Sequence, residues 1–216
     1  MEEEFVPLTP VNFFQISADC HYWPPTEAKG RASKERYRLP DTSALCSEET
    51  FAEVYLGWNE EGLRCVCAVR EPIRHIAYPA LTEGDSIELF IDTRDVKSGG
   101  FNTRFCHHFY LLPEPLEGVQ AGEITHFRTE DSHPLCNPAD LVVKVKKSSS
   151  GYEAELFIPA HCLMGYDPSQ FKRLGFAYRI NRSNQPAQHF TVVSDDFQID
   201  QNPGSWSSLI LQQVKV

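Results

Sequence analysis

Short runs in which apolar and polar residues alternate recur along this chain, and turn residues separate them. The runs TFAEVYLGW and LRCVCAV flank NEEG, and the runs LVVKVKK and YEAELFI flank SSSG. Each arrangement is typical of two antiparallel strands joined in a hairpin. Further runs of this kind are SIELFID, RFCHHFYLL, LGFAYRIN, HFTVVSD and SSLILQQV. The pattern predicts an all-β fold: an antiparallel two-sheet β-sandwich, jelly-roll or immunoglobulin-like, with one short helix over 159–165 and long loops.

Two stretches of the chain lack this periodicity and are expected to be long connections. The first is the proline-rich start through about Pro40, and the second runs from Pro113 to Asp140. No internal repeat, low-complexity tract or obvious linker divides the 216 residues. A chain of this length suits one globular domain with a substantial core, so we expect a single domain over 1–216.

The run GDSIELFIDTRD places acidic residues around a strand that otherwise resembles a buried one. In an extended chain Ile87, Leu89 and Ile91 share one face, which is expected to join the core. Glu88 and Phe90 lie on the other face. A carboxylate beside an aromatic ring favours contact with a ligand, because a solvated strand face rarely carries a phenylalanine. The alternative, in which the acids are simply hydrated, stays open.

The charge of the chain restricts its partners. The formal net charge is -10 at pH 7, which weighs against binding to nucleic acids or to anionic membranes, since both are polyanions. No apolar run approaches the roughly 20 residues that span a bilayer. The start MEEEFVPLTP lacks the basic and apolar regions of a signal peptide. We therefore expect no nucleic-acid partner, no membrane partner and a cytoplasmic location.

The seven cysteines agree with a cytoplasmic location. Their odd number and scattered positions favour reduced thiols over a disulfide framework. Cys65 and Cys67 come nearest to a metal motif, but in a strand they share a face with Leu63 and Val69 and are expected in the core. A zinc site would need a second pair at suitable spacing, and none follows.

Taken in order, the motifs AEVYLGWNEEGLRCVCAVREP, GDSIELFIDTRD, GYEAELFIPAHCL, RLGFAYRINR and WSSLILQ resemble those of the family 9 carbohydrate-binding modules and their DOMON-like β-sandwich relatives. The resemblance covers about 50–216 and leaves 1–49 as an N-terminal extension. Such modules are jelly-roll sandwiches that bind sugars, often at chain ends, and are non-catalytic parts of secreted polysaccharide-degrading enzymes. The resemblance implies a saccharide or other small polar ligand and no catalysis.

The resemblance also suggests site residues. Glu88 stands where the family's motif has a carboxylate that hydrogen-bonds sugar hydroxyls, and Asn181 matches a polar position after the family's Gly-Phe strand. The family's tryptophan three residues before the Asp of the Asp-Ser step is replaced by Thr82. Trp206 falls where the family has a phenylalanine under the final strand, so it is expected in the core, and Trp58 of the first hairpin is expected to be structural.

Strand alternation completes a candidate binding cleft. The adjacent histidines of RFCHHFYLL point apart, and His108 and Tyr110 share the more polar face. If this strand lies beside that of Glu88, as the resemblance implies, both side chains join it. The cleft then has planar hydrogen-bonding groups and an aromatic surface, as polyol recognition requires. The predicted ligand-binding residues are Trp23, Glu88, His108, Tyr110, Arg179 and Asn181.

Three other classes of function are alternatives to a saccharide-binding module. An enzyme is not expected, because Glu88 and Asp92 on one strand would lie about 13 Å apart at roughly 3.3 Å per residue, beyond the ~5–9.5 Å that a glycosidase needs. The common nucleotide-binding, hydrolase and metalloprotease motifs are also missing. A haem-binding module of the DOMON type would require ligands such as Met164 and His161. The third class is a β-sandwich that binds a protein partner and no small ligand. No cofactor is expected, and calcium in the acidic turns stays open.

Overall fold

The computed structural model describes residues 16–25, 34–192 and 197–213. Its first six strands are β1 (Ser17–Tyr22), β2 (Ala52–Asn59), β3 (Gly62–Val69), β4 (Ser86–Asp92), β5 (Cys106–Leu116) and β6 (Val119–Glu123). The other five are β7 (Val142–Ser148), β8 (Gly151–Pro159), β9 (Arg173–Arg182), β10 (Gln185–His189) and β11 (Ser207–Gln212). Short 3₁₀ turns occur at η2 (Glu35–Tyr37), η3 (Ser43–Leu45), η4 (Leu81–Glu83), η5 (Pro138–Asp140), η6 (Ala160–Cys162) and η7 (Pro203–Ser205). The predicted all-β class is confirmed.

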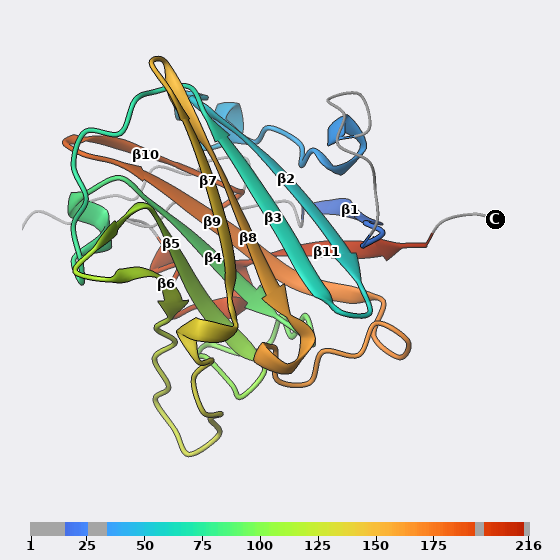
Figure 1. The fold of residues 1–216 in the computed structure, drawn as a ribbon. Coiled ribbons are helices and arrows are strands. Elements are labelled where there is room, and N and C mark those ends of the chain that lie inside the picture. The colour runs from blue at the N-terminus through green and yellow to red at the C-terminus, as the bar shows by residue number, and fades with distance from the viewer. Residues whose placement is uncertain (1–15, 26–33, 193–196, 214–216) are drawn as a thin grey trace, which may run out of the picture.

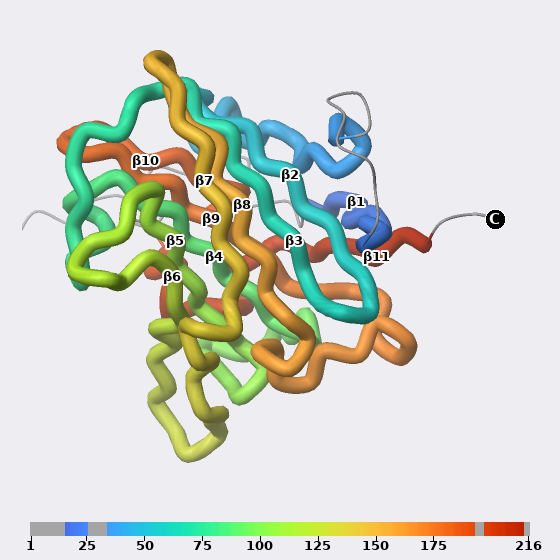
Figure 2. The backbone as a smooth tube through the Cα atoms, viewed as in Figure 1, coloured from blue at the N-terminus to red at the C-terminus, as the bar shows by residue number. Residues whose placement is uncertain are grey.

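The strands form one rolled sheet with the order β6-β5-β4-β9-β11-β1-β2-β3-β8-β7, and β10 pairs with β9 outside this path. Most neighbours are antiparallel, but β1 is parallel to both β11 and β2. In Figure 1 the strands β7, β8, β3 and β2 lie over β5, β4 and β9, and the backbone tube of Figure 2 shows the same arrangement. The sheet is nearly closed, since a salt bridge of 2.6 Å joins Lys147 of β7, one end strand, to Glu114 of β5, the neighbour of the other end strand.

The core lies between the facing parts of this sheet. Alternate residues of β2, β3 and β8 point inward from one side, and alternate residues of β4, β5 and β9 point inward from the other. Side chains that the alternation places inward are buried, which confirms the predicted strand phase: Val54, Leu56, Ile87, Leu89, Ile91, Leu156 and Ile158. Cys65 and Cys67 belong to the same core, as expected, with their sulfur atoms 3.8 Å apart.

Both predicted hairpins are confirmed, since β2 pairs with β3 and β7 pairs with β8 in antiparallel register. The two-sheet sandwich is corrected, because the strands form a single, nearly closed sheet that includes parallel pairs. The helix expected over 159–165 is also corrected: only the 3₁₀ turn Ala160–Cys162 forms there. A seven-residue segment gains too few hydrogen bonds to offset the cost of nucleating an α-helix.

Each of the two expected long connections contains a strand. β1 lies in the proline-rich start, and β6 lies within 113–140. The predicted strand HFTVVSD covers 189–195, but the observed strand β10 ends at His189. Residues 193–195 of that run lie outside the described part of the chain. The sequences of β1, β6 and β10 lack clear apolar alternation. They form strands because their backbones pair with neighbouring strands.

All seven cysteines are buried free thiols, and the expected cytoplasmic location stays a prediction. In the described ranges, no helix combines the length and the apolar character that crossing a bilayer demands.

Gly151, the first residue of β8, occupies a position without room for a side chain. A Cβ atom there would lie 2.1 Å from the carbonyl oxygen of Val69. Gly151→Ala is therefore expected to push β8 away from β3 and to lower the free energy of unfolding by about 1–3 kcal/mol. Gly100, where a Cβ atom would meet nothing within 4 Å, provides the matched control. Urea denaturation compares the two variants, and equal stability would contradict the close approach of these strands.

Candidate functional site

Glu88 lies in the middle of β4, between β5 and β9. Its direct neighbours across the sheet are Tyr110 of β5 and Arg179 of β9. His108 and Asn181 lie one pair further along, each diagonal to Glu88. Paired and diagonal neighbours share one face of a sheet, so the register brings five of the six predicted residues to one face.

Three of these side chains hold the Glu88 carboxylate. Arg179 donates from Nε to Oε1 at 2.7 Å and from Nη2 to Oε2 at 2.8 Å. Asn181 donates from Nδ2 to Oε1 at 2.7 Å, and His108 Nε2 lies 2.8 Å from Oε2. Each carboxylate oxygen therefore has two protein partners, and the bidentate contact with the guanidinium is the geometry of a strong ion pair.

The carboxylate is buried, which corrects the expectation that it faces an open cleft. Glu88 is 1% exposed, and its four contacts use the acceptor positions of both oxygens. Its direct role is to hold Arg179, Asn181 and His108 in fixed positions. Of the three partners, Arg179 is the most exposed, with 13% of its side chain accessible.

The same partners keep Glu88 ionised. Burial alone would raise the pKa of this carboxyl, but hydrogen bonds and charge from His108 and Arg179 outweigh burial and lower the pKa to about 2. The network consequently contains a permanent buried anion at any physiological pH. A buried anion is tolerated only with such partners.

Tyr110 faces a different neighbour from the one predicted. Its ring packs against Tyr78, with ring centroids 5.3 Å apart, and it clusters with Leu81 and Leu112. Burial and a hydrogen bond with Tyr78 raise the pKa of the Tyr110 phenol. Tyr78 itself is 39% exposed, so it extends the aromatic surface beside the Glu88 network into solvent. Sequence reasoning missed Tyr78, because it lies in a loop without strand alternation.

Trp23 does not join this group. It follows β1 and stacks on Tyr37 with ring centroids 4.0 Å apart and an interplanar angle of 10°. Tyr55, Val66 and these two rings form a separate buried cluster over β2 and β3. Trp23 therefore lies apart from the Glu88 network, and its role as a binding aromatic stays a prediction.

The acidic turn after β4 is held by protein groups. Asp92 accepts the backbone N–H groups of Arg94 and Val96 at 2.9 and 2.7 Å, so it caps the exit of the strand. Asp95 forms an ion pair of 2.6 Å with Lys97. A calcium ion in this turn would compete with these contacts, and calcium binding stays an open expectation.

A polar hollow lies where β4 begins and β9 turns into β10. It has a volume of about 690 Å³. Its lining residues are His75, Thr82, Glu83, Ser183, Asn184 and Gln185. Asn181 and Ser86 are close to it in sequence and hydrogen-bond to each other at 2.8 Å. The open space therefore lies at the strand ends, next to the Glu88 network, and not directly over Glu88.

Comparison with known proteins identifies the fold. No protein-family model matches the sequence, and no curated protein matches it. A family 9 carbohydrate-binding module from Caldicellulosiruptor kristjanssonii, solved with glucose, has 16% identity and a TM-score of 0.66, covering 92% of this chain and 96% of that one. The structure solved with cellotriose has 16% identity and a TM-score of 0.64, with 92% and 94% covered.

A third similar structure is a Bacteroides uniformis protein to which carbohydrate binding has been attributed. It has 9% identity and a TM-score of 0.57, covering 91% of this chain and 98% of that one. At such identities the likeness concerns the fold alone. A fold like that of the family 9 modules is confirmed over nearly the whole chain, while the likeness to DOMON-like sandwiches stays a prediction.

Proposed function

We propose that this protein is a non-catalytic saccharide-binding module. The observation that carries the proposal is the likeness of its fold, over 92% of the chain, to modules solved with glucose and with cellotriose. The polar network of Glu88 supports it. A buried carboxylate that fixes the partly exposed Arg179 provides a preorganised hydrogen-bond donor for the hydroxyl oxygens of a neutral polyol.

The roles of the site residues follow from their exposure. Glu88 positions its partners and does not touch the ligand, because its oxygens are already occupied. Arg179 is the member of the network that reaches solvent. Tyr78 offers an exposed ring on which the apolar face of a sugar can pack. The polar hollow at the start of β4 supplies room for further sugar units.

Tyr78→Ala tests the proposal without disturbing the core. In isothermal titration calorimetry with glucose and cellotriose, the wild-type protein is expected to bind, and the variant is expected to bind roughly 10-fold more weakly, which corresponds to about 1.4 kcal/mol. The reason is the loss of aromatic contact area. The thermal midpoint should fall only slightly, because Tyr78 is 39% exposed and loses chiefly its contact with Tyr110.

Phe101→Ala is the matched control, since Phe101 is an equally exposed aromatic residue at 40%. It should bind as the wild type does. Equal weakening by both changes would show that Tyr78 has no specific role. A wild-type protein that binds no member of a broad panel of neutral saccharides would refute the proposal and favour a module that binds a protein partner.

A further inference from the structure

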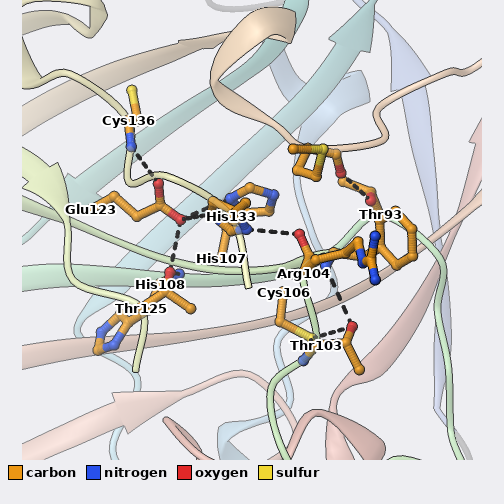
Figure 3. A network of polar contacts seen from close by, with 12 residues as sticks. Thr93, Thr103, Arg104, Cys106, His107, His108, Glu123, Thr125, His133 and Cys136 are labelled. Carbon is orange, nitrogen blue, oxygen red and sulfur yellow. Dashed lines mark hydrogen bonds and ion pairs between the residues drawn. The ribbon is translucent and has the colours of Figure 1, made fainter. Parts of the chain in front are cut away.

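A second polar cluster lies on the opposite side of β5 from the Glu88 network. His107 of β5, Glu123 at the end of β6 and His133 in the following segment come together here. Their side chains are 0%, 0% and 2% exposed. His107 Nδ1 and His133 Nε2 both lie 2.8 Å from the same carboxylate oxygen, Oε1 of Glu123. Figure 3 shows the two rings meeting this carboxylate from one side.

The hydrogen bond at Nδ1 of His133 determines whether its Nε2 atom carries a proton. His133 Nδ1 lies 2.7 Å from the backbone carbonyl of Arg104, and a carbonyl can only accept, so Nδ1 carries a proton. In a neutral imidazole Nε2 then has a lone pair, and this lone pair points at the carboxylate of Glu123. Two electron-rich atoms at this distance repel each other unless a cation or proton lies between them.

His107 presents the same conflict. Its Nε2 atom is buried without a well-formed hydrogen bond. If the proton of neutral His107 is on Nδ1, which faces Glu123, the lone pair of the buried Nε2 has no donor. If the proton is on Nε2, the lone pair of Nδ1 faces Oε1 of Glu123, as that of His133 does. Protonating both histidines would place two imidazolium rings 4.3 Å apart against a single carboxylate. A single dication between His107 Nδ1, His133 Nε2 and Glu123 Oε1 removes the repulsion at the carboxylate without placing two charged rings side by side.

We propose that His107, Glu123 and His133 bind a divalent transition-metal ion, zinc being the ion that their donor set fits, with solvent in the fourth coordination position. Two imidazoles and one carboxylate form the three-ligand set of open zinc sites. The three ligand atoms all lie within 4.8 Å of one another. Zinc bonds of ~2.0–2.2 Å place tetrahedral ligands about 3.3 Å apart, so the 2.8 Å contacts need only a small expansion.

The groups behind these ligands are those of a metal site. Thr125 Oγ1 donates to Oε1 of Glu123 at 2.7 Å, and the backbone N–H of Cys136 donates to Oε2 at 2.7 Å. Together with the Arg104 carbonyl behind His133, they fix the orientation of ligands in the way that outer-shell partners of metal ligands do. These contacts keep the trio in place whether or not the metal is bound.

An open cavity reaches one member of the cluster, His133. A cavity of about 540 Å³ is lined by His133, Cys136, Cys162 and Leu163, among others. In this proposal a metal ion enters from the cavity past His133, and water from the cavity supplies the fourth ligand. Asp140 and His161 lie on the same cavity and form, with Cys162, a second group that could hold a cation. Asp140 and His161 of this second group are exposed at the surface, so we assign the metal to the buried trio.

Metal analysis of the full-length protein tests the assignment. Protein purified without chelator should contain close to one zinc ion per chain by mass spectrometry of the metal. After chelation, Co²⁺ alone should give the visible absorption of a four-coordinate ion with nitrogen and oxygen ligands, without the intense sulfur-to-cobalt band of a thiolate site. Zinc added to the metal-free protein should raise its thermal midpoint, because the ion binds the folded state.

Glu123→Gln and His133→Ala should each weaken zinc binding by at least about 100-fold, more than the loss of an outer-shell partner does. His161→Ala is the matched control from the same cavity and should bind zinc as the wild type does. A wild-type protein with neither bound metal nor a Co²⁺ spectrum would overturn the proposal even if the buried variants fail to fold. Loss of zinc in His161→Ala, or a strong thiolate band, would overturn it in favour of the second group. Saccharide titrations are independent of these readouts, so the two proposals can fail separately.

Discussion

Glu88→Gln is expected to lower the free energy of unfolding by about 3 kcal/mol, the scale of breaking a buried ion pair. Each oxygen of Glu88 receives two donors. An amide at this position turns one acceptor into a donor, which then faces either Arg179 and Asn181 or Arg179 and His108. It also leaves the guanidinium of Arg179 without its countercharge. Chemical denaturation at pH 7 measures the difference between the variant and the wild type.

The stability difference should depend on pH in a defined direction. The pKa of Glu88 falls from 4.5 to about 2 in the folded protein. The ionised form therefore stabilises the fold fully above about pH 4.5, and this contribution is lost as the pH falls through about 2. The gap between the wild type and Glu88→Gln should shrink over that window. Taking the difference cancels the titration of the carboxyl groups that both proteins share.

Glu114→Gln is the matched control, because it removes a carboxylate from an exposed ion pair with Lys147. Its cost should lie between about 0 and 1 kcal/mol, as for surface pairs in general. If Glu88→Gln is as mild as this control, the network around Glu88 contributes little to folding. The carboxylate would then have to act on a ligand directly.

Trp58→Ala is expected to destabilise the protein by about 3–5 kcal/mol, since it removes one of the largest side chains of the core and leaves a cavity. Trp58 is 1% exposed and packs edge-on against Tyr22, with ring centroids 5.3 Å apart. Differential scanning calorimetry and urea denaturation both measure the change. Saccharide affinity, measured at a temperature where the variant is folded, should not change.

Trp58→Phe separates packing from hydrogen bonding at the same position. The indole Nε1 of Trp58 is buried without a partner in the described residues, and an unpaired buried donor costs free energy. A phenyl ring removes that cost and keeps most of the volume, so Trp58→Phe should lose less than half as much stability as Trp58→Ala. Equal losses in the two variants would mean that the indole N–H contributes a hydrogen bond after all.

The strand phase of the core could be predicted because it depends on neighbours in the sequence. In β4 the period of two places Ile87, Leu89 and Ile91 on one face whichever strands pair with it. Closure of the sheet could not be predicted in this way. It depends on β1 pairing in parallel with β2 and β11, and β11 is nearly two hundred residues away along the chain.

In the candidate sites, too, features that depend on neighbouring residues could be predicted, and features that depend on distant ones could not. The contact of Glu88 with Arg179 and Asn181 could be predicted from strand faces and an assumed strand order. That all acceptor positions of the Glu88 carboxylate are occupied could not be predicted, because the donors come from both neighbouring strands at once. The cluster of His107, Glu123 and His133 was missed for a related reason. Adjacent histidines in a strand point apart, as expected, but the partners of His107 come from a region without periodicity, where sequence alone gives no register.

The position of β11 has a consequence for synthesis of the protein. In the sheet order β11 alone joins β9 to β1, and it is the last of the described strands to leave the ribosome. The hairpins β2-β3 and β7-β8 can form as soon as each is complete, since their partners are adjacent in sequence. Until β11 emerges, however, β9 and β1 each have an edge that lacks its final partner. A nascent chain that still lacks β11 thus exposes two open strand edges to its neighbours on a polysome, and such edges promote aggregation.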